Sequence, residues 1–325
     1  MTAAATSGTA PASPPATAAA TPPGAVAARV RGLRKTFGST VAIDDVDLDV
    51  PAGAVLGMLG PNGSGKTTLI RMLLGLTRPT AGTVELLGHA GDDLAAALPD
   101  VGALVEGPGF HPFLSGRDNL LRSAAAEPRL VGDLRAPVDA ALERVGLADA
   151  ARRRYRGYSL GMKQRLGLAA ALLVPRRLVV LDEPTNGLDP AGTRDVRRVV
   201  ADLRETGATV LLSSHLLAEV EAVCSHVAVL QTGTLLVSGE LRALLDADAG
   251  GLVVSTPDVD DAILALRDAG AASYRAEGGV AVPPGTLEAP EVVAALVGAG
   301  VAVWEVHRRR AHLEELFARL TEEDA

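Results

Sequence analysis

The stretch GPNGSGKTT, residues 60–68, decides the fold of this chain. It matches the phosphate-binding loop pattern, in which a glycine and four further residues precede Gly-Lys-Thr. The apolar run at 54–59 predicts a buried strand before the loop, and residues 68–74 predict a helix after it. The pattern requires this strand–loop–helix context. A glycine-rich turn with a chance lysine is the alternative, and the flanking elements argue against it.

The loop residues offer the contacts that the phosphates of a nucleotide need. Its glycines let backbone N–H groups turn inward around phosphate oxygens, and the helix N-terminus adds partial positive charge. We expect Lys66 to reach the β- and γ-phosphates and the Thr67 hydroxyl to ligate Mg²⁺. The predicted nucleotide-binding residues of the loop are Gly60, Asn62, Gly63, Gly65, Lys66, Thr67 and Thr68.

A second strand, at 178–181, ends in two acids. Its continuous apolar sequence LVVL is typical of a strand that is buried on both faces, and Asp182 and Glu183 follow it directly. Adjacent carboxylates at a buried strand end are costly unless a cation or a proton-transfer role accounts for them. We therefore assign Asp182 to the Mg²⁺ shell and Glu183 to general base or water-positioning chemistry. An acidic turn after a strand is the alternative.

Other residues at predicted helix and strand ends are candidates for the same site. Ser159 and Gly161 begin a predicted helix, where free N–H groups can bind an anion. His215 follows a predicted strand at 209–212, at the end where open α/β sheets bind ligands. Asp189 is predicted to cap a helix whose first residue is proline. Each residue also has an ordinary structural interpretation, because capped helices and structural histidines are common.

Two upstream residues have two interpretations each. Phe37 ends an earlier predicted strand, where it would be either a core residue or a platform that stacks on adenine. Glu106 follows the strand-like run at 101–105 and lies in a Gly/Pro loop, where a solvated acid is an equally good interpretation. Ser115 is predicted to cap the next helix.

Composition narrows the class of protein. The hydrophobic fraction of 48% supports a substantial core, while 2% aromatic residues and a net charge of −8 argue against a nucleic-acid surface. The single cysteine, Cys224, permits no internal disulfide and fits a reducing compartment. Its helical context predicts a core residue rather than a nucleophile. The apolar run at 292–304 is too short to span a membrane and the N-terminus lacks signal-peptide features, so we expect a cytoplasmic chain.

The sequence pattern divides the chain into three parts. Residues 1–24 are almost entirely Ala, Thr, Pro, Ser and Gly, and we predict that they are disordered. Residues 25–240 carry all the motifs above. Residues 241–325 predict an accessory α+β domain in βαββαβ order, as in a ferredoxin-like fold, with its last strand at 301–306. The closing helix has its apolar residues on one face: Leu313, Leu316, Phe317 and Leu320. We expect this part to be a packing appendage without a ligand.

Taken together, residues 28–240 resemble the ATP-binding subunit of an ABC transporter. The loop at 60–68 is similar to the family's Walker A loop, and residues 178–182 are similar to its Walker B strand. Glu183 is similar to the catalytic carboxylate, and His215 to the switch histidine. The resemblance implies an α/β P-loop NTPase fold with an antiparallel β subdomain and a helical subdomain.

The remaining family motifs are present in the expected order. Phe37 is similar to the aromatic residue that stacks on adenine, and residues 186–189, which end in Asp189, are similar to the D-loop. Ser159 and Gly161 are similar to the signature residues that contact the γ-phosphate. The signature sequence Leu-Ser-Gly-Gly-Gln is altered here to Tyr-Ser-Leu-Gly-Met.

Glu106 stands where the family has a glutamine between the two subdomains. A carboxylate at this position can still ligate Mg²⁺ or position water. The surrounding sequence VGALVEGPGF is similar to the exporter subunits of the bacitracin-resistance and lantibiotic-immunity type.

The resemblance implies an ATP-hydrolysing subunit of an exporter of drugs or antibiotic peptides, with ATP and Mg²⁺ as cofactors. Lys66, Glu183 and His215 would be its catalytic residues. One set of motifs implies a head-to-tail dimer with a second ATP-binding subunit, a homodimer rather than a heterodimer, in which Ser159 and Gly161 face the other subunit's loop. A separately encoded transmembrane permease would hold the dimer at the cytoplasmic face of the membrane, and no nucleic-acid partner is expected.

A soluble ABC ATPase that acts on DNA or ribosomes is the alternative. DNA-repair types need a long coiled coil between the motifs, and ribosome-associated types carry two nucleotide domains; this sequence has neither. A regulatory nucleotide-binding module without turnover is a third possibility, and Asp182, Glu183 and His215 argue against it.

Overall fold

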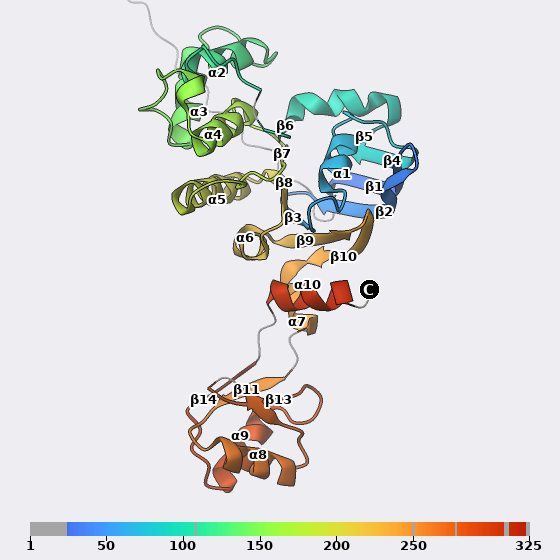
Figure 1. The fold of residues 1–325 in the computed structure, drawn as a ribbon, viewed down its shortest axis with the longest axis vertical. Helices are drawn as coiled ribbons and strands as arrows, with labels where there is room; N and C mark the ends of the chain where they lie inside the picture. Colours follow the sequence, from blue (N-terminus) through green and yellow to red (C-terminus); the bar gives the residue numbers. More distant parts are fainter. Residues whose placement is uncertain (1–24, 108, 249–250, 277, 309–311, 323–325) are drawn as a thin grey trace, which may run out of the picture.

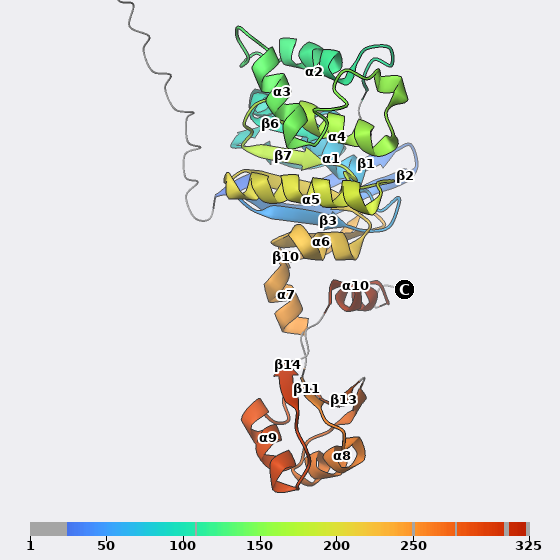
Figure 2. The same cartoon turned by 90° about the vertical axis from the view of Figure 1, so that its left-hand side faces the viewer.

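The computed structural model describes residues 25–107, 109–248, 251–276, 278–308 and 312–322. The predicted disordered segment at 1–24 lies outside the described residues. The described part of the chain contains two four-stranded sheets and one six-stranded sheet. Figures 1 and 2 show the six-stranded sheet within the larger part of the molecule and one of the four-stranded sheets at its far end.

The elements up to residue 240 include both strands and helices. In chain order they are β1 Val26–Phe37, β2 Thr40–Pro51, β3 Val55–Leu59, α1 Lys66–Leu73, β4 Ala81–Leu86, β5 His89–Ala90, the 3₁₀ helix η1 Gly91–Asp100, β6 Val101–Leu104, α2 Gly116–Ala125, α3 Arg135–Arg144, the 3₁₀ turn η2 Tyr155–Gly157, α4 Leu160–Ala171, β7 Leu178–Leu181, α5 Pro190–Glu205, β8 Thr209–Ser214, α6 Leu217–Val223, β9 His226–Gln231 and β10 Thr234–Glu240.

The six-stranded sheet has the order β10-β9-β3-β8-β7-β6. β9, β3, β8, β7 and β6 pair in parallel, and β10 returns antiparallel to β9 as a hairpin. Every residue of β3, β7 and β8 is buried, which confirms the prediction of strands covered on both faces. The carboxyl ends of these three neighbouring strands meet at one edge of the sheet, so the loops that follow them converge there.

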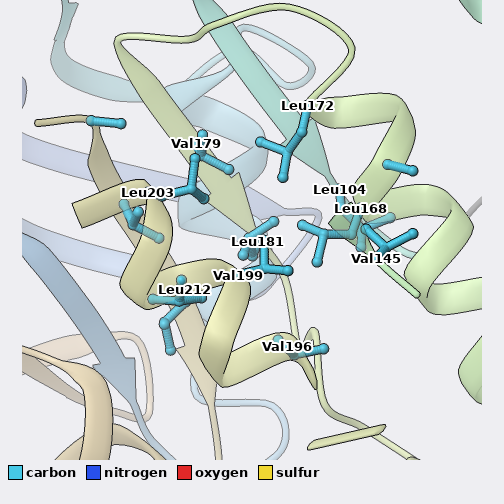
Figure 3. Close-up of a cluster of buried hydrophobic side chains, with 14 of the residues drawn as sticks. Leu104, Val145, Leu168, Leu172, Val179, Leu181, Val196, Val199, Leu203 and Leu212 are labelled. Carbon is cyan, nitrogen blue, oxygen red and sulfur yellow. The ribbon is translucent and has the colours of Figure 1, made fainter. Parts of the chain in front are cut away.

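The two faces of this sheet pack against different helices. Val179 and Leu181 of β7 contact the core that α4 and α5 share (Figure 3), whereas Leu178 and Val180 contact the core around α1. Side chains alternate along a strand, so one continuous apolar run supplies both cores. The core around α1 also includes residues of the antiparallel sheet β2-β1-β4-β5.

Helices α2, α3 and α4 form the helical subdomain beyond the β6 edge of the sheet (Figure 1). Ser115 caps α2, as predicted, by accepting a hydrogen bond of 3.1 Å from the Asp118 N–H. An ion pair ties this subdomain to the sheet, because Arg176, just before β7, lies 2.6 Å from the carboxylate of Glu127, just after α2. Burial raises the pKa of Glu127, but the hydrogen bonds and charges of Arg176 and Arg129 outweigh it and lower that pKa. The pair therefore stabilises the fold above the ordinary pKa of glutamate and stops doing so as the pH falls through the lowered value.

The accessory part follows through α7. Its elements are α7 Leu241–Asp248, β11 Leu252–Ser255, α8 Val259–Asp268, β12 Tyr274–Ala276, β13 Gly279–Val282, α9 Ala289–Gly298, β14 Glu305–Arg308 and α10 Leu313–Glu322. The strands form an antiparallel sheet in the order β12-β13-β11-β14, which confirms the predicted βαββαβ arrangement with ferredoxin-like strand order.

The last strand of this sheet lies later in the chain than predicted. The sequence predicts a strand at 301–306, whereas β14 begins at Glu305. β11 ends at Ser255, which pairs with Glu305 and accepts a hydrogen bond from the Trp304 N–H, so β11 is too short to pair with residues 301–303. Val301 is nevertheless buried in the accessory core, which explains its apolar sequence pattern.

α10 returns from the accessory sheet to the larger part of the molecule. Leu313 and Leu316 are buried in the core that contains α4 to α6, and Glu221 of α6 accepts hydrogen bonds from the Leu313 N–H and the His312 ring. Leu241 of α7 joins the same core. α7 and α10 thus pack against the part formed by residues 25–240 (Figures 1 and 2), although the sequence pattern groups them with residues 241–325.

None of the helices in the described ranges is long and apolar enough to span a membrane.

Replacing Arg176 with methionine is expected to lower the free energy of unfolding by about 3 kcal/mol, because Glu127 stays almost buried without its closest cation. Urea unfolding at pH 7 measures the change. Adding Glu127→Gln to this variant should restore more than half of the loss, since the uncompensated charge is then removed. A double variant as unstable as Arg176→Met would contradict this account.

Cys224 is expected to resist alkylation in the folded protein. Burial raises the pKa of its thiol to about 12, so at pH 8 the reactive thiolate is about 10³-fold scarcer than in an ordinary cysteine. Iodoacetamide labelling followed by mass spectrometry should modify Cys224 in urea and leave it unmodified in buffer. Equal labelling rates in both conditions would contradict the burial of this thiol.

Candidate active site

The glycines of the loop at 60–65 let it fit closely against two other segments. A Cβ atom at Gly65, where φ is +104°, would lie 2.7 Å from the Ala42 carbonyl oxygen and 2.6 Å from Ile43 Cδ1. A Cβ at Gly60 would contact the Leu230 carbonyl oxygen. Gly63 has a positive φ as well, but the space around it is open. The loop is therefore held between the start of β2 and the end of β9, and of its three glycines Gly63 alone has open space around it.

Lys66 lies inside the curve of this loop. Its side chain is only 6% exposed, and its Nζ donates to the carbonyl oxygens of Gly60 at 2.7 Å and Pro61 at 3.1 Å. The Ser64 Oγ is also buried and has no hydrogen-bond partner in the described part of the chain. A buried ammonium group held by weak neutral acceptors, beside an unpaired hydroxyl, suits a site that receives an anion.

Thr67 and Asp182 meet across the sheet edge. The Thr67 hydroxyl donates to Asp182 Oδ2 at 2.9 Å, and the Asp182 side chain is buried. Mg²⁺ commonly takes one or two protein oxygens and completes its shell with substrate phosphates and water. No cluster of three or more metal-binding side chains occurs among the residues that the structure describes. The Thr67–Asp182 pair thus fits an ion held jointly with ATP.

Glu183 connects the groups that the sequence predicted to be catalytic. Its Oε2 lies 2.7 Å from His215 Nδ1, and its Oε1 lies 3.6 Å from Lys66 Nζ. These three side chains follow β3, β7 and β8, whose carboxyl ends converge. Glu183 also adopts φ +48°, a left-handed conformation that is strained for a residue with a Cβ. Such strain is characteristic of functional sites.

The predicted signature residues lie in the helical subdomain, on α4, and not beside Lys66. Ser159 caps α4 by accepting a hydrogen bond of 3.2 Å from the Met162 N–H. Between Ser159 and Gly161, the Leu160 side chain is 58% exposed. Asp189 caps α5 in the same way, accepting from the Gly192 N–H at 2.9 Å.

Two other predicted residues contact groups other than the Thr67–Asp182 pair. The carboxylate of Glu106, which adopts φ +57°, forms an ion pair with Arg71 of α1 and is about half exposed. The Phe37 ring is exposed and has the Lys35 ammonium 4.9 Å from its centroid, a cation–π contact. Within the loop, Asn62 is exposed and Thr68 is half-buried.

Sequence reasoning missed two groups that touch this site. Ser213 hydrogen-bonds to Asp182, and Glu219 of α6 accepts from the Thr185 hydroxyl, two residues after Glu183. The sequence does contain a sign of Ser213: it is a hydroxyl residue that directly follows an apolar run and lies two positions before His215. Glu219 has no comparable signal, since an acid in the first turn of a helix is common.

Comparison with known proteins gives the family. An ABC transporter family profile matches residues 43–186. YdbJ, an uncharacterised ABC transporter ATP-binding protein of Bacillus subtilis, is 37% identical over 297 residues, which cover 90% of this chain and 94% of the relative. The chain belongs to the ABC transporter ATP-binding proteins. The resemblance inferred from the motifs is confirmed, and with it an ATPase and its fold.

Other relatives of this ABC ATPase have named roles. The daunorubicin resistance ATP-binding protein DrrA3 of Streptomyces coeruleorubidus is 37% identical over 305 residues, covering 92% of this chain and 96% of the relative. The bacitracin transport ATP-binding protein BcrA of Bacillus licheniformis is 43% identical over 207 residues, covering 63% and 66%. A solved ATP-binding subunit of an ABC transporter is 25% identical, with a TM-score of 0.62 over 68% of this chain and 92% of that one. None of these is described as acting on DNA or ribosomes, so that alternative is not favoured.

Gly65→Ala is expected to weaken ATP binding about tenfold or more, because the added methyl group must displace Ala42 or Ile43 and with them the loop. Gly63→Ala is the matched control within the loop, since Gly63 also has a positive φ, +85°, but open space around it. Titration with a fluorescent ATP analogue measures both affinities. Equal losses in the two variants would show that backbone strain, and not the close fit of the loop, controls binding.

Proposed function

We propose that this ABC ATPase drives a separately encoded membrane exporter of drugs or antibiotic peptides. The ATPase assignment has its support in the convergence of Lys66, Glu183 and His215 at one sheet edge. The exporter assignment has its support in relatives named for daunorubicin resistance and for bacitracin and lantibiotic transport. The relative named for daunorubicin resistance aligns along almost the whole chain, including the accessory residues.

The polar contacts of Glu183 suggest how nucleotide would rearrange the site. Both carboxylate oxygens are engaged, one by His215 and one by Lys66. Phosphate oxygens are stronger acceptors for an ammonium group than the carbonyls of Gly60 and Pro61, so bound ATP would draw Lys66 onto its β- and γ-phosphates. Glu183 would then orient the attacking water, and Lys66 and His215 would stabilise charge on the γ-phosphoryl group.

Thr67 and Asp182 would hold Mg²⁺ together with the phosphates of ATP. The ion would supply positive charge that offsets the charge developing on the phosphoryl oxygens. Glu106 could join this shell or position water only if its carboxylate left Arg71, so its proposed role requires a rearrangement of that ion pair. Phe37 would stack on adenine, and the Lys35 ammonium lies over its ring.

A head-to-tail homodimer would complete each site. Ser159 and Gly161 begin α4 with an exposed apolar residue, Leu160, between them, which fits a surface that another subunit covers. The N-terminus of α4 would face the γ-phosphate bound to Lys66 of the second subunit. Asp189, at the start of α5, would lie near the same junction. The dimer would act on its permease at the cytoplasmic face of the membrane, without a nucleic-acid partner.

Glu183→Gln is expected to bind ATP with an affinity within about threefold of wild type and to hydrolyse it about 10²- to 10⁴-fold more slowly, because the amide cannot act as a base. Single-turnover hydrolysis and analogue titration measure the two effects. The variant should also accumulate as an ATP-dependent dimer in size-exclusion chromatography. Undiminished single-turnover hydrolysis would remove Glu183 from its proposed role.

The dimer can be tested independently of the chemistry. Adding Ser159→Arg to Glu183→Gln should abolish the ATP-dependent dimer while ATP still binds, because Ser159 lies on α4, apart from the loop that holds the phosphates. Asp149→Arg, an exposed change in the connection before η2, is the matched control and should leave the dimer intact. A dimer that survives Ser159→Arg would contradict the head-to-tail arrangement.

A further inference from the structure

Ser213 is a buried hydroxyl group in β8, directly after the three apolar residues Val210, Leu211 and Leu212. It is the fifth residue of β8, has no exposed surface, and pairs with Met58 of the strand that leads into the phosphate loop. Leu211, two residues earlier on the same face, belongs to the apolar core around α1. A buried hydroxyl at such a position is costly unless it is hydrogen-bonded, so its bonds indicate why it is there.

Both bonds of Ser213 go to the acids that follow β7. Its Oγ donates to Asp182 Oδ1 at 2.7 Å and accepts from the Glu183 N–H at 2.8 Å. One hydroxyl thus acts as a donor to the proposed Mg²⁺ carboxylate and as an acceptor for the backbone of the proposed water-positioning residue. Both the donor and an acceptor position of this hydroxyl are therefore used by residues of the site.

The first of these bonds sets the orientation of Asp182. The Thr67 hydroxyl lies 2.9 Å from Oδ2 and 3.2 Å from Oδ1, while Ser213 donates to Oδ1, so the two hydroxyls together hold the carboxylate. If Thr67 turned to a bound cation, Ser213 would still hold the Asp182 carboxylate in place. Hydrogen bonds of this kind, from a neighbour to a ligating carboxylate, raise metal affinity by restricting the ligand.

The second bond supports the strained backbone of Glu183. A residue with a Cβ adopts φ +48° only where its surroundings hold it there. The hydrogen bond from the Glu183 N–H to Ser213 holds the backbone of this strained residue directly. The carboxylate of Glu183 then projects toward Lys66 and His215, which it contacts in the structure.

We propose that Ser213 is a positioning residue that couples the Mg²⁺ site to the hydrolytic site. It would orient Asp182 toward the ion and hold Glu183 in its left-handed conformation through the same hydroxyl. This inference rests on the proposed roles of Asp182 and Glu183. It adds a residue that touches neither the nucleotide nor the ion.

Metal binding without turnover provides the first test. Electron paramagnetic resonance can measure the affinity for Mn²⁺ of the protein bound to a non-hydrolysable ATP analogue. This affinity should be about tenfold lower in Ser213→Ala. The affinity of the fluorescent analogue in EDTA should stay within twofold of wild type, because Ser213 lies outside the phosphate loop. Ser213→Thr keeps the hydroxyl and should restore at least half of the lost Mn²⁺ affinity.

Turnover provides the second test. Ser213→Ala should lower kcat about tenfold at saturating Mg²⁺ and raise the Mg²⁺ concentration for half-maximal rate, while KM for ATP changes little. Thr209→Val is the matched control, because it removes a buried hydroxyl from the other end of β8, where Thr209 accepts from the Gly53 N–H. Thermal melting of all variants separates loss of folding from loss of positioning.

The outcomes distinguish the inference from the function on which it rests. If Asp182→Asn weakens Mn²⁺ binding and Ser213→Ala does not, Ser213 has no positioning role and the proposed function stands. If neither variant changes Mn²⁺ binding, both assignments are wrong. A loss of equal size in Thr209→Val would also overturn the inference, because it would show that any buried hydroxyl of β8 matters to the same degree.

Discussion

Lys66 brings a positive charge into a nearly closed loop, and the rest of the site depends on how that charge is compensated. The loop carbonyls of Gly60 and Pro61 accept from it directly, and Glu183 approaches it from the next strand but one. A buried ammonium group without such partners would be too costly to keep in its charged form. The compensation is local and weak enough for phosphate oxygens to replace it, which is what a binding site for ATP requires.

Parallel strand pairing makes this compensation possible. β3, β8 and β7 are neighbours in one sheet, so the residues that follow them arrive at the same edge, although Lys66 lies more than a hundred positions before Glu183 and His215 in the chain. Their apolar side chains alternate between two cores, and this packing fixes the strand register. A slip of one residue in β8 would turn Ser213 and His215 away from Asp182 and Glu183. The packing of the hydrophobic cores therefore sets the geometry of the charged groups.

The accessory part adds contacts that reach toward the same edge from outside. α10 packs on α6, whose Glu219 binds the hydroxyl of Thr185, two residues after Glu183. Glu221, one half-turn later, holds the start of α10. α6 thus lies between the C-terminal helix and the segment that carries the proposed catalytic carboxylate. This contiguity is a physical path, through which a change at either end could alter the other.

The sequence by itself determined the phosphate loop, the acid-bearing strand, the helix caps at Ser115, Ser159 and Asp189, and the order of the accessory elements. Each of these depends on residues within about ten positions of one another, where the glycine pattern, the period of apolar residues and the capping side chains act directly on the backbone.

Only the tertiary structure decided the partners of Glu106, the role of Ser213 and the packing of α10. An acid in a loop gives no sign that Arg71 of a distant helix will take its charge, and a serine in a strand gives no sign of which carboxylate it will meet. These contacts join segments far apart in the chain, so they depend on strand order and register. Those are set by the packing of whole apolar faces, not by any local motif.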